Sequence, residues 1–363
     1  MLPLGLRPGD SVGSFFISIS LHGPVLWPCH FVPSSERIKR SLFDKEHYPE
    51  KEVLTMKKVF RIIGIVLGSI IGLILVAGMV LYFIGTTRLN RMYDIQVENV
   101  PIPTDQRSIA RGRHLAEAVT VCQVCHGDQL QGTVIEDQPM LVTLTAPNLT
   151  SGQGGVGDSL NDADFVRAIR HGVGPDSRGL IVMHSDIFHN LSEQDLGAVI
   201  AYVKSVPPVD HKLPETQATM LGRIMIGSGV LDSDSVPLIP AERIDQNASF
   251  AEMPAQGVTA EYGGYLMSIT LCRMCHGPDL AGGKFPDPSV STAVTPNLTP
   301  GGELGIWTET QFASTLKTGV TPNRHELDPN LMPWNVFGKM TDDELNAIWL
   351  YLQSLPAMDQ YTP

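Results

Sequence analysis

The stretch AVTVCQVCHGDQLQG, residues 118–132, places two cysteines two residues apart and a histidine directly after the second cysteine. Three kinds of site share this spacing: a redox-active dithiol, half of a zinc site, and an attachment point for haem. The surroundings of the motif, and whether it recurs, decide among the three.

The motif occurs twice, each time in similar surroundings. LAEAVTVCQVCHGDQLQG (115–132) resembles LMSITLCRMCHGPDLAG (266–282), and TAPNLT (145–150) resembles VTPNLT (294–299). A regular offset, here about 150 residues, is the mark of an internal repeat. We therefore expect two copies of one fold, at residues 104–207 and 258–358, joined by a proline-rich linker at 208–257.

Each copy has the pattern of a helical fold. Thr341 and Glu344 form a capping box ahead of an apolar stripe, and Ser192 with Asp195 begins the matching helix of the first copy. Strand signals are weak, so we predict an all-α chain. Within the linker, MLGRIMIGSGVL (220–231) is expected to form a short helix against the domains or the membrane surface.

The helical, duplicated context favours haem. A zinc ribbon needs two cysteine pairs close together in sequence, and a thioredoxin-like dithiol needs a βαβ unit. Haem attachment needs two thiols that meet the vinyl groups and a histidine that turns toward the iron. The sequence therefore predicts two covalently bound haem c groups. The predicted attachment residues are Cys122, Cys125 and His126 in the first copy, and Cys272, Cys275 and His276 in the second.

A six-coordinate haem needs a second axial ligand, which should recur in both copies. Met183 lies 57 residues after His126, and Met332 lies 56 residues after His276. Both precede the capped C-terminal helix of their copy, so we predict them as iron ligands. His184 is a rival ligand in the first copy. Bis-histidine ligation ranks second, because Pro333 stands at that place in the second copy.

An apolar segment near the start of the chain predicts a membrane anchor, placed at residues 56–85. Ile62 to Ile84 is a run of 23 residues without a charge, enough to cross a hydrocarbon core of about 30 Å. Lys57, Lys58 and Arg61 precede it, so the positive-inside rule leaves the N-terminus in the cytoplasm and exports the rest. A cleaved signal peptide is the alternative, but the run is long and no A-x-A-like site follows it.

Residues 1–55 show no helical or strand periodicity. MKKVFRIIG, from Met56, reads like the start of an exported bacterial protein. We hypothesise that translation begins at Met56, which would remove Cys29 and leave the four motif cysteines. The alternative is a disordered cytoplasmic tail, and the intact mass of the purified protein distinguishes the two.

The net charge of −12 disfavours nucleic acid as a partner, because phosphates would repel an acidic protein. The exported part is more acidic still, since three basic residues stay ahead of the apolar run. This charge favours partners with a basic docking face.

These features resemble class I cytochrome c domains in tandem. The chain is similar to membrane-anchored dihaem cytochromes and to the cytochrome subunits of bacterial membrane-bound alcohol and gluconate dehydrogenases, over about residues 104–358. The resemblance rests on CQVCH, CRMCH, both PNLT segments, GIWTETQF, the methionine loops and the helix ends YVKSVPP and YLQSLPA. It implies that Pro147 and Pro296 present carbonyls to the histidine rings and that Trp307 faces a haem propionate. Leu160 stands in place of Trp307 in the first copy.

Electron transfer is the function predicted. A haem closed by His and Met has no open position for a substrate, and Met ligation raises its reduction potential. The expected partners are redox proteins: a membrane quinol-oxidising complex, a dehydrogenase, an oxidase or a reaction centre. The expected location is the cytoplasmic membrane, with the haem domains on the periplasmic or extracellular side and lipid around the N-terminal helix. A peroxidase-like dihaem enzyme and a fixed subunit of a dehydrogenase or oxidase complex are the alternatives.

Overall fold

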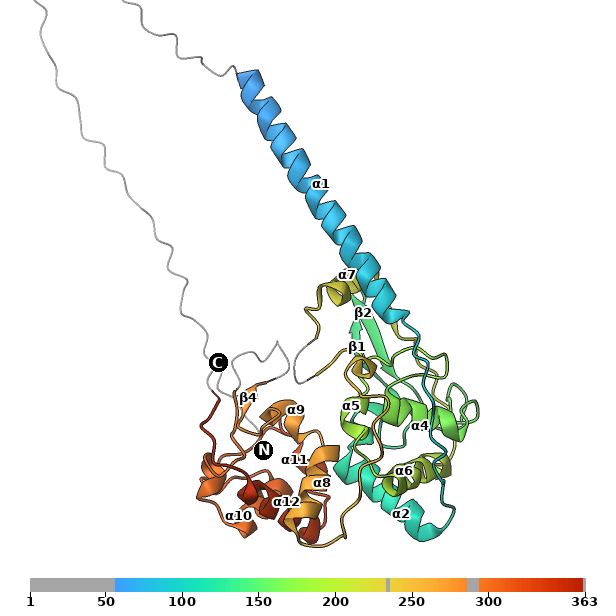
Figure 1. Cartoon of the computed structure of the whole chain (residues 1–363), viewed down its shortest axis with the longest axis vertical. Helices are drawn as coiled ribbons and strands as arrows, with labels where there is room; N and C mark the ends of the chain where they lie inside the picture. Colours follow the sequence, from blue (N-terminus) through green and yellow to red (C-terminus); the bar gives the residue numbers. More distant parts are fainter. Residues whose placement is uncertain (1–55, 233–235, 286–293, 362–363) are drawn as a thin grey trace, which may run out of the picture. The chain divides into compact units, whose positions relative to one another are not determined.

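The computed structural model describes residues 56–232, 236–285 and 294–361 (Figure 1). The predictions for residues 1–55 and for Cys29 fall outside this part of the chain. The described residues are mostly helical, which confirms the helical prediction in its coarse form.

The first helix, α1 (Met56–Leu89), contains the predicted apolar run and continues past it at both ends. The most apolar 18-residue window of α1 has a mean hydropathy of 2.7, and none of that window is buried. By length and composition α1 can therefore cross a membrane.

In the described part of the chain, the first copy has five α-helices, of which the first and the last cross at a glycine. They are α2 (Gln106–His114), α3 (Cys122–His126), α4 (Asp162–His171), α5 (Ser185–Phe188) and α6 (Glu193–Ser205). Helix α2 packs on α6, and a Cβ added to Gly112 would clash at 1.9 Å with the carbonyl oxygen of Ala198. Only glycine permits so close an approach of the two helix backbones.

The second copy has a corresponding set of helices. They are α8 (Ala260–Ile269), α9 (Cys272–His276), α10 (Glu309–Thr318), α11 (Trp334–Phe337) and α12 (Asp342–Ser354), with a 3₁₀ turn, η4, at Glu303–Gly305. Helix α8 packs on α12, and a Cβ added to Gly263 would clash at 1.9 Å with Ala347 O. Gly112 and Gly263 therefore mark the same helix crossing in the two copies.

One difference between the copies has a local structural cause. Ten residue steps separate Gly112 from Cys122, but nine separate Gly263 from Cys272. The extra residue of the first copy is taken up in a π-helical turn, η1 (Leu115–Val119), in which Thr120 N donates to Leu115 O at 2.8 Å. A π-bulge absorbs an inserted residue while the helix on either side keeps its face.

Strands are the part of the fold that the sequence did not predict. β1 (Thr133–Gln138), β2 (Val142–Ala146) and β3 (Gln217–Ala218) form an antiparallel sheet in that order, and β4 (Gly283–Lys284) pairs with β5 (Val294–Thr295). The prediction of an all-α chain is therefore too strict. β1 and β2 are rich in threonine and valine, which favours strands, but β1 is mostly exposed and lacks an alternating apolar pattern.

The apolar core joins the two copies. One cluster of buried side chains contains Leu115 and Leu196 of the first copy together with Leu266 and Leu345 of the second. A smaller cluster, centred on Ile226 and Ile239, packs the linker on the first copy. The linker contains α7 (Met220–Ser228), as its apolar sequence predicted, and a 3₁₀ turn, η2 (Pro240–Glu242).

Candidate functional site

Each Cys-x-x-Cys-His motif folds as a single helical turn, α3 in the first copy and α9 in the second. All four cysteines are free thiols rather than disulfides. Burial raises the pKa of each of the four thiols, that of Cys275 to about 11. The unattached side chains are therefore neutral thiols at physiological pH. A threonine hydroxyl lies beside the first thiol of each pair, at 3.3 Å for Thr120 and 3.2 Å for Thr270.

The two motif histidines are held in the same way. His126 Nδ1 lies 3.0 Å from the carbonyl oxygen of Pro147, and His276 Nδ1 lies 2.8 Å from that of Pro296. A carbonyl can only accept, so Nδ1 must donate and Nε2 keeps its lone pair. Burial lowers the pKa of both histidines, despite the opposing effect of the carbonyl. Each ring is therefore neutral and presents the nitrogen that a metal ion binds.

The asparagine and threonine of each PNLT segment form hydrogen bonds that fix the backbone next to the proline carbonyl. Asn148 Oδ1 accepts from the N–H and the hydroxyl of Thr150 at 2.9 and 2.8 Å, and its Nδ2 donates to Val209 O at 2.8 Å. In the second copy, Asn297 makes the same bonds to Thr299, both at 2.8 Å, and to Met358 O at 2.7 Å.

These asparagine and threonine side chains are buried. Sequence reasoning identified the prolines and missed the asparagines and threonines. The signal was present, because all four letters of PNLT are identical in the two copies.

A tight turn after each motif fixes the backbone next to the histidine. Gly132 N donates to His126 O at 2.7 Å, and Gly282 N donates to His276 O at 3.0 Å. Both glycines have positive φ angles, +80° and +87°, and a Cβ on either would lie within 2.6 Å of neighbouring backbone atoms. These positions therefore require glycine.

The predicted methionine ligands occupy matching places. Met183 O accepts from Ser185 N at 2.7 Å at the start of α5, and Met332 O accepts from Trp334 N at 2.6 Å at the start of α11. His184 directly follows Met183, and Pro333 directly follows Met332. Their backbone angles are nearly equal: φ −72° and ψ 49° for His184, and φ −74° and ψ 57° for Pro333. Both methionines are half-buried and pack against the main apolar cluster.

The rival ligand belongs to the first copy alone. Burial lowers the pKa of His184, and His184 Nδ1 is buried without a hydrogen-bond partner within the described residues. Asp186 Oδ1, two residues on, is also buried without a hydrogen-bond partner within the described residues. Pro333 offers no donor atom at the corresponding place.

Trp307 and Leu160 also correspond. Each is half-buried against the main apolar cluster and directly precedes the N-cap residue of a helix, Thr308 for Trp307 and Asn161 for Leu160. The replacement of tryptophan by leucine thus removes an indole N–H from the first copy at an equivalent position.

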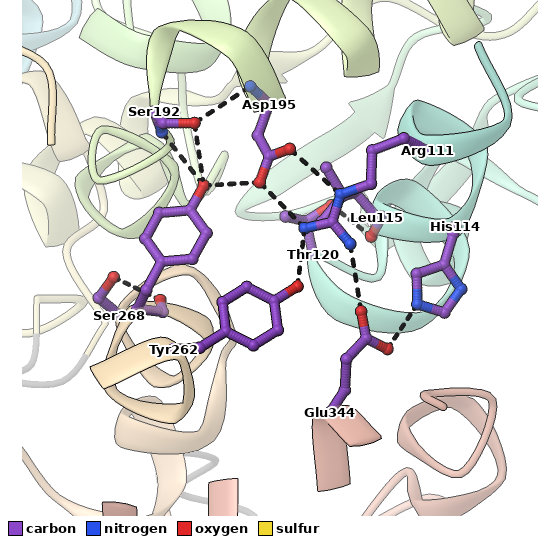
Figure 2. A network of polar contacts seen from close by, with 10 residues as sticks. Arg111, His114, Leu115, Thr120, Ser192, Asp195, Tyr262, Ser268 and Glu344 are labelled. Atoms are coloured by element: carbon purple, nitrogen blue, oxygen red, sulfur yellow. Dashed lines mark hydrogen bonds and ion pairs between the residues drawn. The ribbon is translucent and has the colours of Figure 1, made fainter. Parts of the chain in front are cut away.

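A polar network joins the copies, and sequence reasoning missed it (Figure 2). Arg111 forms ion pairs with Asp195 of its own copy at 3.1 Å and with Glu344 of the second copy at 3.2 Å. His114 Nε2 lies 2.6 Å from Glu344, and the Tyr265 hydroxyl donates to Asp195 at 2.8 Å. Both carboxylates are almost fully buried, so they depend on these partners.

The donor sets of both copies fit a covalently attached haem. Each copy offers two free thiols on one helical turn, a neutral histidine whose Nε2 is available, and a methionine in a matching loop. This is the combination that class I haem c sites use.

Comparison with known proteins agrees with this geometry. The family model for cytochrome c matches residues 109–207 and 260–356, more than half of the chain. The chain belongs to the cytochrome c family. This confirms the resemblance predicted from the sequence. Cytochrome c domains bind haem c covalently and carry electrons, so the chain is a haem protein of electron transport.

The relatives that the chain matches are named as subunits of dehydrogenases. The chain is 26% identical, over 272 residues, to the cytochrome c subunit of alcohol dehydrogenase (quinone) from Gluconacetobacter polyoxogenes and from Komagataeibacter europaeus. The match covers 69% of this chain and 57% of each relative. One of the subunits of nicotinate dehydrogenase from Pseudomonas putida is 26% identical over 277 residues, which are 69% of this chain and 22% of that protein. The chain thus spans little more than half of the length of the first two relatives.

Proposed function

We propose that the chain is a membrane-anchored dihaem cytochrome c that carries electrons between redox partners on the exported side of the membrane. The duplicated histidine geometry carries this proposal. In both copies a neutral, buried histidine donates from Nδ1 to a braced proline carbonyl, at 3.0 and 2.8 Å. Such a bond fixes the ring and raises the basicity of Nε2, which suits an axial ligand.

The residues that would hold each haem follow from this geometry. Cys122 and Cys125 would form the thioethers of the first haem, with His126 and Met183 as axial ligands. The corresponding set for the second haem is Cys272, Cys275, His276 and Met332, with Trp307 near a propionate. When bound, haem c supplies a one-electron redox centre. The chain's own part is to bury that centre, orient the histidine through Pro147 or Pro296, and close the remaining axial position with methionine.

Contacts at the end of α1 support an uncleaved anchor. Arg88, on the last turn of α1, pairs with Asp232 at 2.8 Å and with Glu242 at 2.6 Å, both in the linker. A cleaved signal peptide would not take part in the folded protein in this way. With Lys57, Lys58 and Arg61 on the cytoplasmic side, both haem domains would lie on the exported face.

The domain plan that follows is an anchor at 56–85, cytochrome domains at 104–207 and 258–358, and a linker at 208–257. The similarity to the cytochrome c subunit of alcohol dehydrogenase (quinone) favours a membrane dehydrogenase as the electron donor. It also favours a second form of the proposal, in which the chain is a fixed subunit of such a complex.

An anaerobic redox titration of the detergent-purified protein, with and without carbon monoxide, tests the proposal. We expect two haems per chain, both at high potential, with visible spectra that carbon monoxide does not change. One haem at low potential that binds carbon monoxide would contradict the methionine ligation and favour a peroxidase-like enzyme. A stoichiometry of one haem per chain would contradict the dihaem assignment.

A further inference from the structure

The outer surface of α7 is apolar although it is exposed. Met220 is 70% exposed and Leu221 43% exposed, and Val230 and Leu231, in the turn after the helix, are 66% and 40% exposed. Isolated exposed apolar side chains are common, but a group of them on one short segment indicates an interaction site.

Helix α7 packs directly against the apolar run of α1 (Figure 1). A Cβ on Gly85 would clash at 1.9 Å with Arg223 O, and a Cβ on Gly227 would clash at 1.9 Å with Leu81 O. Ile224 Cδ1 lies 4.0 Å from where a Cβ of Gly78 would be. Glycines on both helices therefore let the two backbones touch.

The position of these contacts gives the depth of α7. Gly78 lies six residues before Ile84, the last residue of the uncharged run. At 1.5 Å per residue this places part of α7 about 9 Å inside the end of the apolar segment. Helices that lie in a membrane interface bury their apolar face to a depth of about 5–10 Å.

The β1–β2 turn extends the apolar surface. Met140, which is 77% exposed, stands at that turn, and its carbonyl accepts from the hydroxyl of Thr219, the N-cap of α7, at 2.7 Å. We call Met140, Met220, Leu221, Val230 and Leu231 the apolar collar. The nearby Arg88 is neutralised by Asp232 and Glu242 and also donates to Ile226 O at 2.9 Å.

We propose that the apolar collar is a lipid-binding surface, with α7 lying in the exported leaflet of the membrane beside the anchor. This inference rests on the proposed anchoring by α1. The occupant is lipid because the collar continues the apolar surface of α1, and none of the most apolar window of α1 is buried within the protein. Because α7 packs on the first copy through Ile226, the contact would hold that copy against the membrane.

Photolabelling of the full-length holoprotein in phosphatidylcholine vesicles tests this. An apolar, carbene-generating diazirine is dissolved in the bilayer, and the labelled residues are mapped by mass spectrometry. We expect label on α1 and on residues 220–231, at a level several-fold above that on Ile306. Ile306 is the matched control, because it is 85% exposed and lies in the second copy.

The double variant M220E/L221E provides a second measurement. We expect its labelling at residues 220–231 to fall several-fold while labelling of α1 and haem content stay as in the native protein. The variant I306E should change neither signal. Label on α1 without label on residues 220–231 would overturn the inference and leave the anchor standing. Label on neither segment would overturn both, and equal label on Ile306 and α7 would overturn the inference as well.

Discussion

Arg111 in the first copy lies 3.2 Å from Glu344 in the second, measured from Nη1 to Oε1. Around this pair, each copy directs a side chain of its first helix to the carboxylate on the last helix of the other copy. His114 follows Arg111 by three residues and contacts Glu344, while Tyr265 follows Tyr262 by three residues and contacts Asp195. Asp195 and Glu344 are both the third residue of their helix, bonded to the N-cap side chain. Such reciprocal contacts are those of a two-fold interface, here within one chain.

We expect Arg111→Met to lower the free energy of unfolding of the whole protein. The change leaves two buried carboxylates without their cation, and removing one partner of a buried pair costs about 3–5 kcal/mol. Denaturant unfolding followed by haem absorbance measures the free energy of unfolding. The control is Arg178→Met, since Arg178 is exposed and its oxygen–nitrogen distance to Asp176 is 3.8 Å. A surface pair of this kind contributes less than about 1 kcal/mol. Equal effects of the two changes would contradict the role of Arg111.

The stability of the interface should depend on pH, because Glu344 titrates at a lower pH in the folded protein than in the unfolded chain. Burial opposes its ionisation, but hydrogen bonds from His114 and the Thr341 N–H, with the charges of His114 and Arg111, outweigh burial and lower the pKa of Glu344 to about 2. The carboxylate of an unfolded glutamate titrates near pH ~4.3. The stabilisation is therefore complete above that value and is lost as the pH falls toward about 2.

We expect this group to contribute on the order of 3 kcal/mol to the change in unfolding free energy over that range. Glu344→Gln should flatten the slope of stability against pH between about 4.5 and 2, measured by denaturant unfolding at each pH. Glu303→Gln, at an exposed glutamate of the same copy, is the control. A slope that is unchanged in the Glu344 variant would rule out the coupling.

Asn297→Ala should loosen the proline carbonyl that orients His276. The change removes the acceptor for the Thr299 N–H and hydroxyl and leaves buried groups unpaired, which costs about 1–3 kcal/mol. We expect lower stability and a lower reduction potential of the second haem, with the first haem unchanged. Redox titration and denaturant unfolding check both effects. Asn330→Ala, at an exposed asparagine that bonds to Asp328, should change neither.

The duplicated parts of the chain were the ones that the sequence predicted well. Two in-register copies predicted the helices and the matching positions of Met183 and Met332, because a repeat shows which positions the fold constrains. The interface was out of reach, since the residues that pair with Asp195 and Glu344 differ in type between the copies. Arg111 corresponds to Tyr262, and His114 corresponds to Tyr265. Contacts between unlike residues that are far apart in the chain leave no periodic pattern in the sequence from which they could be predicted.

The short strands and η1 were missed for local reasons. The paired segments of β3, β4 and β5 have two residues each, too few for an alternating pattern to be visible. The π-helical turn follows from a one-residue difference that becomes meaningful only when Gly112 and Gly263 are seen at the same helix crossing. A comparison of the two copies from each glycine to its motif could have found it.

The final prediction separates the two haem sites. Met332→Ala should open an axial position, so that the second haem binds carbon monoxide and its potential falls, because methionine ligation raises the potential. Met183→Ala should bind carbon monoxide more weakly. His184 is adjacent and half-buried, its Nδ1 is buried without a partner within the described residues, and it can take the vacated position, whereas Pro333 cannot. The double variant Met183→Ala with His184→Ala should then bind carbon monoxide as Met332→Ala does.

Met140→Ala, at a 77% exposed methionine, is the control and should leave the spectra of both haems unchanged. Equal carbon monoxide affinity in the two single variants would show that His184 does not replace Met183.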